Sequence, residues 1–256
     1  MHLRPGNATS HGLELPQPAA GCMHASYGAR MFKHDTAIEG IDGVKAFIAD
    51  KSFPCVGAKS ALNKDRMRML YFGAMASPDS TRALWEALVN NSQEFPDPGS
   101  VPVSFVAVFD DAVTDEAGFE HLLWQQLQAL HDHDHEKGIV WDRTVSSDPS
   151  KVDFSFSVGG RAFFVVGLHP GASRMARRTP FPCIVFNFHN QFESLKASGK
   201  YTGMQDAIRR RDTALQGSVN PVLARFGESS EAEQYSGRAA DGAWKCPFSA
   251  RGIAND

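Results

Sequence analysis

Cysteine is scarce in this chain, and the four that occur among its 256 residues lie far apart, at positions 22, 55, 183 and 246. Because no two of them form a CxxC pair, a zinc knuckle and a redox-active dithiol are excluded. In a reducing compartment all four should be thiols. Long apolar runs are missing as well: none approaches the roughly 20 residues of a membrane-spanning helix, and no basic start with an apolar core indicates a secretion signal. We expect a cytoplasmic protein with no membrane partner.

An excess of either charge is also lacking, since 26 Lys and Arg residues stand against 29 Asp and Glu residues, for a net charge of -3. That balance gives no general attraction to nucleic acid. The densest basic run, residues 209–211, does not change this expectation, because neighbouring residues of a helix diverge by about 100° and no aromatic side chains are interleaved for base stacking. The Gly159-Gly160 pair fits neither phosphate-loop pattern, and no Gly-x-Ser-x-Gly elbow occurs. Any basic site must therefore be local.

The chain does contain enough apolar sequence, 42% of its residues, for one large core. Residues 1–27 show no sustained apolar period, which predicts a disordered extension, and residues 28–256 are expected to form a single domain. Apolar residues recur at helical spacing over residues 37–50, 60–75, 80–91, 115–131, 191–198 and 204–216. Residues 227–256 are mostly irregular, which is typical of a segment wrapped over a site.

Four stretches rich in Val, Phe and Ile predict strands, over residues 101–109, 152–158, 161–168 and 181–188. Gly159-Gly160 predicts a hairpin turn between the second and the third. Strands and helices do not alternate along the chain, so a doubly wound parallel sheet is not expected. The predicted fold class is α+β: N-terminal helices followed by a mainly antiparallel sheet with flanking helices.

Two of the predicted strands each end on a histidine, His169 and His189, and a basic loop with Arg174, Arg177 and Arg178 lies between them. Strand ends that deliver imidazoles beside guanidinium groups can hold a flat, apolar, dianionic cofactor such as haem, with the arginines on its propionates. A proline follows His169, and because proline has no N–H and a fixed φ, the chain must leave the strand there. The imidazole can then point into a cavity. Isolated histidines are, however, more often structural than ligands.

Two other groups allow competing interpretations. Cys246 lies in Trp-Lys-Cys-Pro-Phe, and a Cys-Pro step beside aromatic residues is a setting for thiolate ligation of haem iron. Residues 131–136, His-Asp-His-Asp-His-Glu, resemble a metal-binding sequence, although consecutive residues point to different faces of a helix. Three interpretations of these residues are open: a solvated helix end, a pair of carboxylates that binds a cationic substrate, and the zinc site of a metal hydrolase.

Taken together, these blocks resemble the YqcI/YcgG family over about residues 40–250. The matching residues are Phe-Pro-Cys-Val-Gly-Ala-Lys-Ser-Ala-Leu (53–62), Leu-His-Asp-His-Asp (130–134), Val-Ser-Ser-Asp-Pro (145–149), the block 154–174, Val-Phe-Asn-Phe-His-Asn-Gln-Phe-Glu (185–193), Ile-Arg-Arg-Arg-Asp (208–212), Leu-Gln-Gly-Ser-Val-Asn-Pro (215–221), Ser-Glu-Ala-Glu-Gln-Tyr-Ser-Gly-Arg (230–238) and Trp-Lys-Cys-Pro-Phe (244–248). The family includes haem-dependent N-hydroxylases of guanidine and amine substrates. The resemblance therefore implies a haem mono-oxygenase that hydroxylates a nitrogen of arginine or a related compound, with an external electron donor or peroxide.

The resemblance also orders the candidate residues. His169 is the first choice for the iron ligand, with His189 second and Cys246 third, and Arg174 and Arg178 are expected to hold the propionates. The acidic residues in matching blocks that can pair with a cationic substrate are Asp132, Asp134 and Glu231. The alternative function is a non-catalytic haem sensor or carrier, because the sequence shows no redox-partner domain or flavin site. A homodimer is left open.

Overall fold

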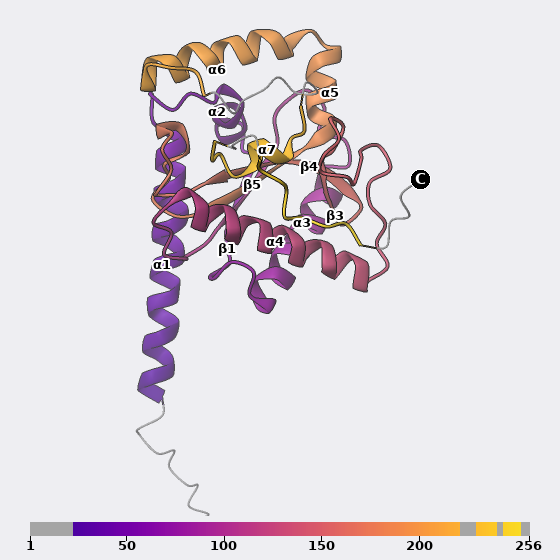
Figure 1. The fold of residues 1–256 in the computed structure, drawn as a ribbon. Helices are drawn as coiled ribbons and strands as arrows, with labels where there is room; N and C mark the ends of the chain where they lie inside the picture. The colour runs from indigo at the N-terminus through magenta and orange to yellow at the C-terminus, as the bar shows by residue number, and fades with distance from the viewer. Residues whose placement is uncertain (1–22, 221–228, 240–242, 252–256) are drawn as a thin grey trace, which may run out of the picture. The chain divides into compact units, whose positions relative to one another are not determined.

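A five-stranded sheet with strand order β1-β2-β5-β4-β3 is the centre of the fold. Strand β1 runs parallel to β2, and the other neighbouring pairs are antiparallel. The α+β prediction with a mainly antiparallel sheet is therefore confirmed (Figure 1). The strands are β1 (Met67–Tyr71), β2 (Ser104–Val108), β3 (Phe156–Val158), β4 (Arg161–Leu168) and β5 (Cys183–Phe188).

The computed structural model describes residues 23–220, 229–239 and 243–251, with side chains from residue 35 onward. The chain divides into two units, Met1–Asp35 and Thr36–Asp256, and the second contains every strand just named. The described helices are α1 (Met23–Ala49), α2 (Val56–Asn63), α3 (Pro78–Glu94), α4 (Glu116–Glu136), η1 (Met175–Arg177), α5 (His189–Ala197), α6 (Lys200–Gln216) and α7 (Ala232–Tyr235). None of these helices is long and apolar enough to cross a bilayer.

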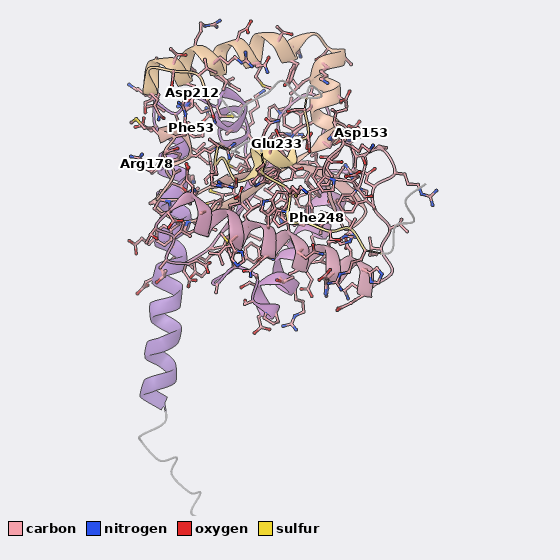
Figure 2. All side chains as sticks on the ribbon, in the orientation of Figure 1. Phe53, Asp153, Arg178, Asp212, Glu233 and Phe248 are labelled. Atoms are coloured by element: carbon pink, nitrogen blue, oxygen red, sulfur yellow. The ribbon has the colours of Figure 1, made fainter. Side chains whose placement is uncertain are left out.

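The two faces of the sheet carry different layers, and the pleat assigns each residue to one of them. On one face, Phe105, Phe163 and Phe186 join a core that includes Leu84 of α3 and Leu123 of α4. The opposite face packs against the end of α1 and the segment after it, through Val106, Val108, Leu168, Cys183, Val44, Ile48 and Phe53. Figure 2 shows Phe248 near α4 and Asp212 on α6, the helix of the opposite layer.

Polar caps explain where α3 and α4 begin. The Ser77 side chain accepts a hydrogen bond from the N–H of Ser80, and the Asp115 side chain accepts one from the N–H of Gly118. Each cap satisfies one of the N–H groups that a helix N-terminus leaves without a partner. The first of these caps precedes a proline at the start of the helix, which needs no hydrogen bond there.

The prediction of one helix over residues 60–75 is wrong. Helix α2 ends at Asn63, Asp65 adopts a left-handed conformation with φ of 55°, and strand β1 begins two residues later. The N–H of Arg66 donates back to the carbonyl of Ala61 at 2.8 Å, which closes the helix end. The Met and Leu residues of β1 are apolar residues that also favour a helix, which led to the prediction. Their burial in the structure alternates from residue to residue, as in a strand. Helix α1 begins at Met23, inside the predicted extension, and residues 1–22 lie outside the described residues.

Candidate functional site

A cavity of about 270 Å³ lies on the sheet face away from α3 and α4. Its floor contains a row of three valines, Val106, Val185 and Val166, which are direct neighbours across β2, β5 and β4. Residues of α2, α5 and α6 and the chain segment 53–55 complete its wall. Small-molecule sites have volumes of roughly 300 to 1,000 Å³ and mostly apolar walls, so this cavity is slightly smaller than that class.

A second row of the floor is polar. Ser104 donates from its hydroxyl to Oδ1 of Asn187 at 2.7 Å, and Nδ2 of Asn187 lies 3.4 Å from the carbonyl oxygen of Phe164. These three residues are also cross-strand neighbours and line the cavity. The asparagine is held in one orientation by these bonds, so this end of the floor presents fixed polar groups.

Arg177 is a buried cation in the wall. Its Nη1 donates to the carbonyl oxygens of Gly167 and Tyr235, both at 3.1 Å, and its Nη2 donates to that of Gln234 at 2.9 Å. No carboxylate of the described residues lies within ion-pair distance of it, and burial lowers its pKa to about 10. A buried charge without a counterion is costly. An anionic group of a ligand would therefore be stabilised beside this guanidinium.

Asp212 brings a carboxylate to the same wall. Its Oδ2 accepts hydrogen bonds from Nη2 of Arg174 at 2.7 Å and from the N–H of Asn220 at 2.8 Å. Its Oδ1 is buried and has no hydrogen-bond partner among the described residues. Arg174 also donates to the hydroxyl and the carbonyl of Ser218. The predicted propionate ligand Arg174 is thus bound to Asp212 and to Ser218.

Cys55 is the cysteine of the cavity wall, and it is the N-cap of α2. Its Sγ accepts a hydrogen bond from the N–H of Ala58 at 3.4 Å. Burial raises the pKa of its thiol, while that hydrogen bond opposes the effect. The cavity therefore contains one sulfur atom that is already in contact with the positive end of a helix.

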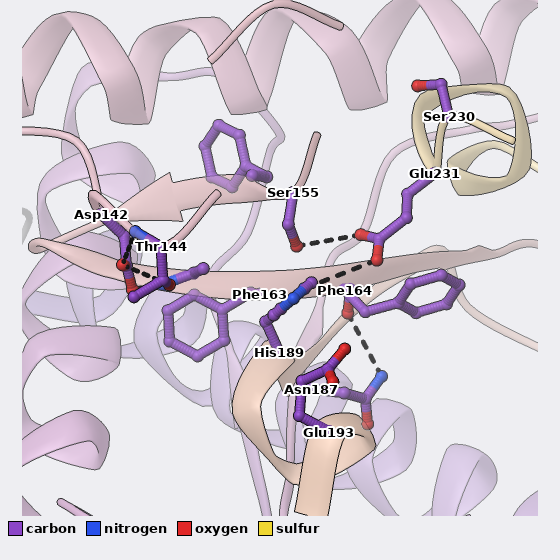
Figure 3. A network of polar contacts seen from close by, with 12 residues as sticks. Asp142, Thr144, Ser155, Phe163, Phe164, Asn187, His189, Glu193, Ser230 and Glu231 are labelled. Atoms are coloured by element: carbon purple, nitrogen blue, oxygen red, sulfur yellow. Dashed lines mark hydrogen bonds and ion pairs between the residues drawn. The ribbon is translucent and has the colours of Figure 1, made fainter. Parts of the chain in front are cut away.

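A buried polar network lies next to the cavity (Figure 3). Oε2 of Glu231 accepts hydrogen bonds from the hydroxyls of Ser155 at 2.9 Å and Tyr235 at 3.1 Å, and Oε1 lies 3.6 Å from Nδ1 of His189. The link to the cavity is Phe164, which lines it and has its ring centroid 5.9 Å from that of Tyr235. The structure thus brings together two predicted site residues, Glu231 and His189.

His169 lies on the other side of the sheet. Every second residue from 163 to 169 faces α4. The His169 ring stacks on that of Phe119, with centroids 4.3 Å apart. It is buried, it does not belong to the residues that line the cavity, and burial lowers its pKa to about 4. Its role as iron ligand stays a prediction that this position does not favour.

Two other predicted cofactor residues are also placed away from the cavity. Arg178 donates from Nε to the carbonyl of Ala172 at 2.9 Å and from Nη2 to that of Ser173 at 3.3 Å. Cys246 packs against the core on the α4 side, where burial raises the pKa of its thiol to about 12. Neither belongs to the residues that line the cavity.

The predicted substrate carboxylates of α4 have structural contacts instead. Asp134 is buried and accepts hydrogen bonds from Nε1 of Trp85 at 2.6 Å and from the N–H of Gly159 at 2.8 Å, and burial raises its pKa. Asp132 pairs with Nε of Arg251 at 3.0 Å. Within the described part of the chain, which includes residues 131–136, no cluster of His, Cys, Asp or Glu suited to a metal ion is found.

Sequence reasoning missed three residues of the wall: Cys55, Arg177 and Asp212. Cys55 and Asp212 lie in blocks that carry the family resemblance, and Arg177 lies in the basic loop after His169. The sequence therefore did contain a signal for each of them. Successive side chains of a strand point to opposite faces of the sheet. This alternation places Phe164, Val166 and Leu168 on the cavity face and His169 on the other face.

Comparisons with known proteins agree with the sequence blocks. The uncharacterized protein YqcI of Bacillus subtilis (strain 168) is 25% identical over 214 residues, which cover 78% of this chain and 83% of YqcI. No solved structure matches the chain. The model of the YqcI/YcgG family matches residues 44–249, a range that contains every residue lining the cavity. The chain therefore belongs to the YqcI/YcgG family.

Proposed function

We propose that the protein is a haem-dependent oxygenase that hydroxylates a nitrogen of a guanidine or amine substrate, and that haem binds in the cavity. The observation that carries the proposal is the buried guanidinium of Arg177 in the wall of a mostly apolar cavity. A ligand that suits this wall has an apolar body and an anionic group. Haem, the cofactor that the family resemblance implies, has both.

The residues of the wall fit the requirements of haem in their chemistry. Arg177 and Arg209 are the two arginines that line the cavity, and either guanidinium can pair with a propionate. The three floor valines and Phe164 give the apolar surface that a porphyrin ring requires. A sulfur donor is present as well, in Cys55. The set differs from the predicted one, in which Arg174 and Arg178 held the propionates.

Bound haem would supply the activation of dioxygen or peroxide for insertion of one oxygen atom into an N–H bond. With dioxygen, the second oxygen atom leaves as water after two electrons and two protons arrive from an external donor, whereas peroxide brings both electrons itself. The residues of this chain would bind and orient the substrate. Oδ1 of Asp212 is the acceptor for its guanidinium or ammonium group, because it is a buried carboxylate oxygen without a donor among the described residues.

Glu231 and His189 would assist proton transfer at the edge of this site. The carboxylate is buried and its Oε1 lies 3.6 Å from Nδ1 of His189. Ser155 and Tyr235 hold Oε2 in place through their hydroxyls. Of the three carboxylates predicted from the sequence, only Glu231 keeps a role next to the cavity.

A substrate screen tests the proposal. The purified protein, expressed with haem supply, is incubated with arginine, guanidines and amines, with either a reductant and oxygen or peroxide, and products are analysed by mass spectrometry. The proposal expects a Soret band and a product heavier by one oxygen atom. A Soret band without any oxidised product would favour the alternative, a non-catalytic haem-binding protein. A protein that binds no haem would overturn both.

A further inference from the structure

Tyr235 of the short helix α7 is the buried residue that joins the cavity wall to the aromatic core. Its carbonyl oxygen accepts a hydrogen bond from Arg177, and its ring centroid lies 5.9 Å from that of Phe164; both of these residues line the cavity. On its other side the ring stacks on Trp124 of α4, with centroids 5.8 Å apart and 25° between the planes. Tyr235 therefore contacts the cavity wall and the core of the opposite face at once.

The hydroxyl of Tyr235 has a fixed proton acceptor. It lies 3.1 Å from Oε2 of Glu231, a buried carboxylate and a stronger acceptor than the carbonyl of Phe163 at 3.3 Å, and it accepts the N–H of Phe156 at 3.0 Å. Burial, and then the charge of Glu231, raise the pKa of this hydroxyl well above its usual value, so it stays protonated at rest. Removal of one electron makes a phenol a strong acid. The proton can then pass to the carboxylate within hydrogen-bond reach.

Two tryptophans continue the line of rings from Tyr235 to the surface. The ring centroid of Trp244 lies 6.4 Å from that of Trp124, and Trp244 is only half-buried. The segment of Trp244 is held on α4 by the bond from the N–H of Ser249 to Oε1 of Gln128 at 3.0 Å. Nε1 of Trp124 is buried without a hydrogen-bond partner among the described residues, so this ring can pass on an electron but has no acceptor for its proton.

Contact between aromatic rings is by itself only core packing, and phenylalanines such as Phe248, which also packs on Trp124, are not oxidised by one-electron oxidants. The row differs because its three rings are all oxidisable and the buried end has a proton acceptor. Tyr71 provides the comparison. Its hydroxyl also pairs with a carboxylate, that of Asp110 at 2.5 Å, but it packs in the apolar cluster of the other sheet face.

We propose that Tyr235, Trp124 and Trp244 form an electron path, which gives the protein a second activity: one-electron oxidation of phenol-type or ascorbate-type reductants at the surface near Trp244. The proposal rests on the proposed function, because haem with peroxide is the oxidant in the cavity. Across the ring of Phe164, Tyr235 gives that oxidant an electron and gives Glu231 its proton. Electrons from Trp124, Trp244 and the reductant then refill each ring in turn, and the proton returns to Tyr235. Two such passages, with two protons from the reductants, convert one peroxide to two water molecules.

Radical detection in the protein without haem tests the path itself. A photo-oxidised ruthenium complex in solution takes electrons from exposed rings, and EPR of samples with ring-deuterated tyrosine identifies a tyrosyl radical. The wild-type protein and Tyr71→Phe should form a long-lived radical, and Tyr235→Phe should lose it. Trp124→Phe should form it more slowly, whereas Trp85→Phe, whose indole is bonded to Asp134 outside the row, should form it at the wild-type rate. An unchanged long-lived radical in Tyr235→Phe would overturn the proposal.

The haem-loaded protein tests the second activity. With peroxide it should oxidise the dye ABTS, which is too large for a cavity of about 270 Å³. Trp244→Phe should lose this oxidation but keep haem binding and substrate hydroxylation, and Trp85→Phe should keep all three. A wild-type protein that binds no haem contradicts the proposed function, and the radical test then decides on the path. Haem binding with no oxidation of the dye, or with equal oxidation in all three proteins, contradicts only the further inference.

Discussion

Nη2 of Arg174 lies 2.7 Å from Oδ2 of Asp212, and both side chains are buried. The pair joins the basic loop after β4 to helix α6, on the side of the sheet where the cavity lies. It fixes the carboxylate whose other oxygen belongs to the proposed substrate site. The same contact therefore links the stability of the fold to ligand binding.

Removal of one partner should reveal this link. Asp212→Asn leaves the Arg174 guanidinium buried without a counterion, and removing one member of a buried pair costs about 3–5 kcal/mol of unfolding free energy. Urea unfolding monitored by circular dichroism measures the loss. Arg174→Met combined with Asp212→Leu removes both charges and should restore much of the stability without restoring substrate binding. An unchanged midpoint for Asp212→Asn would contradict the role of the pair.

His169 should make the protein less stable in mild acid. Its pKa is lowered from 6.5 to about 4 by burial, so the unfolded chain binds a proton more readily than the folded one. Stability from this group is complete above the unfolded pKa and is lost as pH falls toward the folded pKa. Between pH 7.5 and pH 5 the loss is about 2 kcal/mol. His169→Gln should show a smaller pH dependence in urea unfolding at these two pH values and should still bind haem. An equal pH dependence in the variant would exclude this residue as the cause.

Glu231 should affect turnover more than cofactor binding. Glu231→Gln keeps the shape of the side chain but removes the charge beside His189, and loss of acid–base assistance lowers rates by about 100-fold. Glu233→Gln is the matched control, since it is exposed on the same short helix (Figure 2). Rates and haem content are measured on both. If both variants turn over at the same rate, the network has no part in proton transfer.

Gly167 should be intolerant of a side chain. A Cβ there would collide with the ring of Phe119 and come within 2.8 Å of Cδ1 of Leu123. Overpacking of this kind destabilises a core by about 1–3 kcal/mol, which lowers the thermal midpoint of Gly167→Ala. Gly203→Ala in α6 has open space around it and should be stabilising by roughly 1 kcal/mol, because alanine is the better helix former. A thermal midpoint for Gly167→Ala at or above wild type would contradict the packing of β4 on α4.

The sheet was largely predictable because its buried strands are short apolar runs rich in Val and Phe, such as Cys183–Phe188. Strand β1 was not predictable, because two of its five residues are exposed and its Met and Leu residues favour a helix equally well. The histidine after β4 was recognised, but its direction depends on the pleat and on α4, which supplies Phe119 from a segment about 50 residues earlier. Arg177 differed from its neighbours in the loop only through the carbonyls that surround it, and these come from β4 and α7. Such contacts depend on tertiary structure, which local sequence patterns do not encode.

Titration of haem into the purified apoprotein tests the central claim most directly. The proposal predicts a saturable Soret band at one haem per chain. In Val166→Phe the larger side chain occupies part of the cavity floor, so binding should be lost, while the exposed Val152→Phe binds as the wild type does. Saturable binding that is identical in all three proteins would place haem elsewhere, and the absence of stoichiometric binding to the wild-type protein would contradict the account.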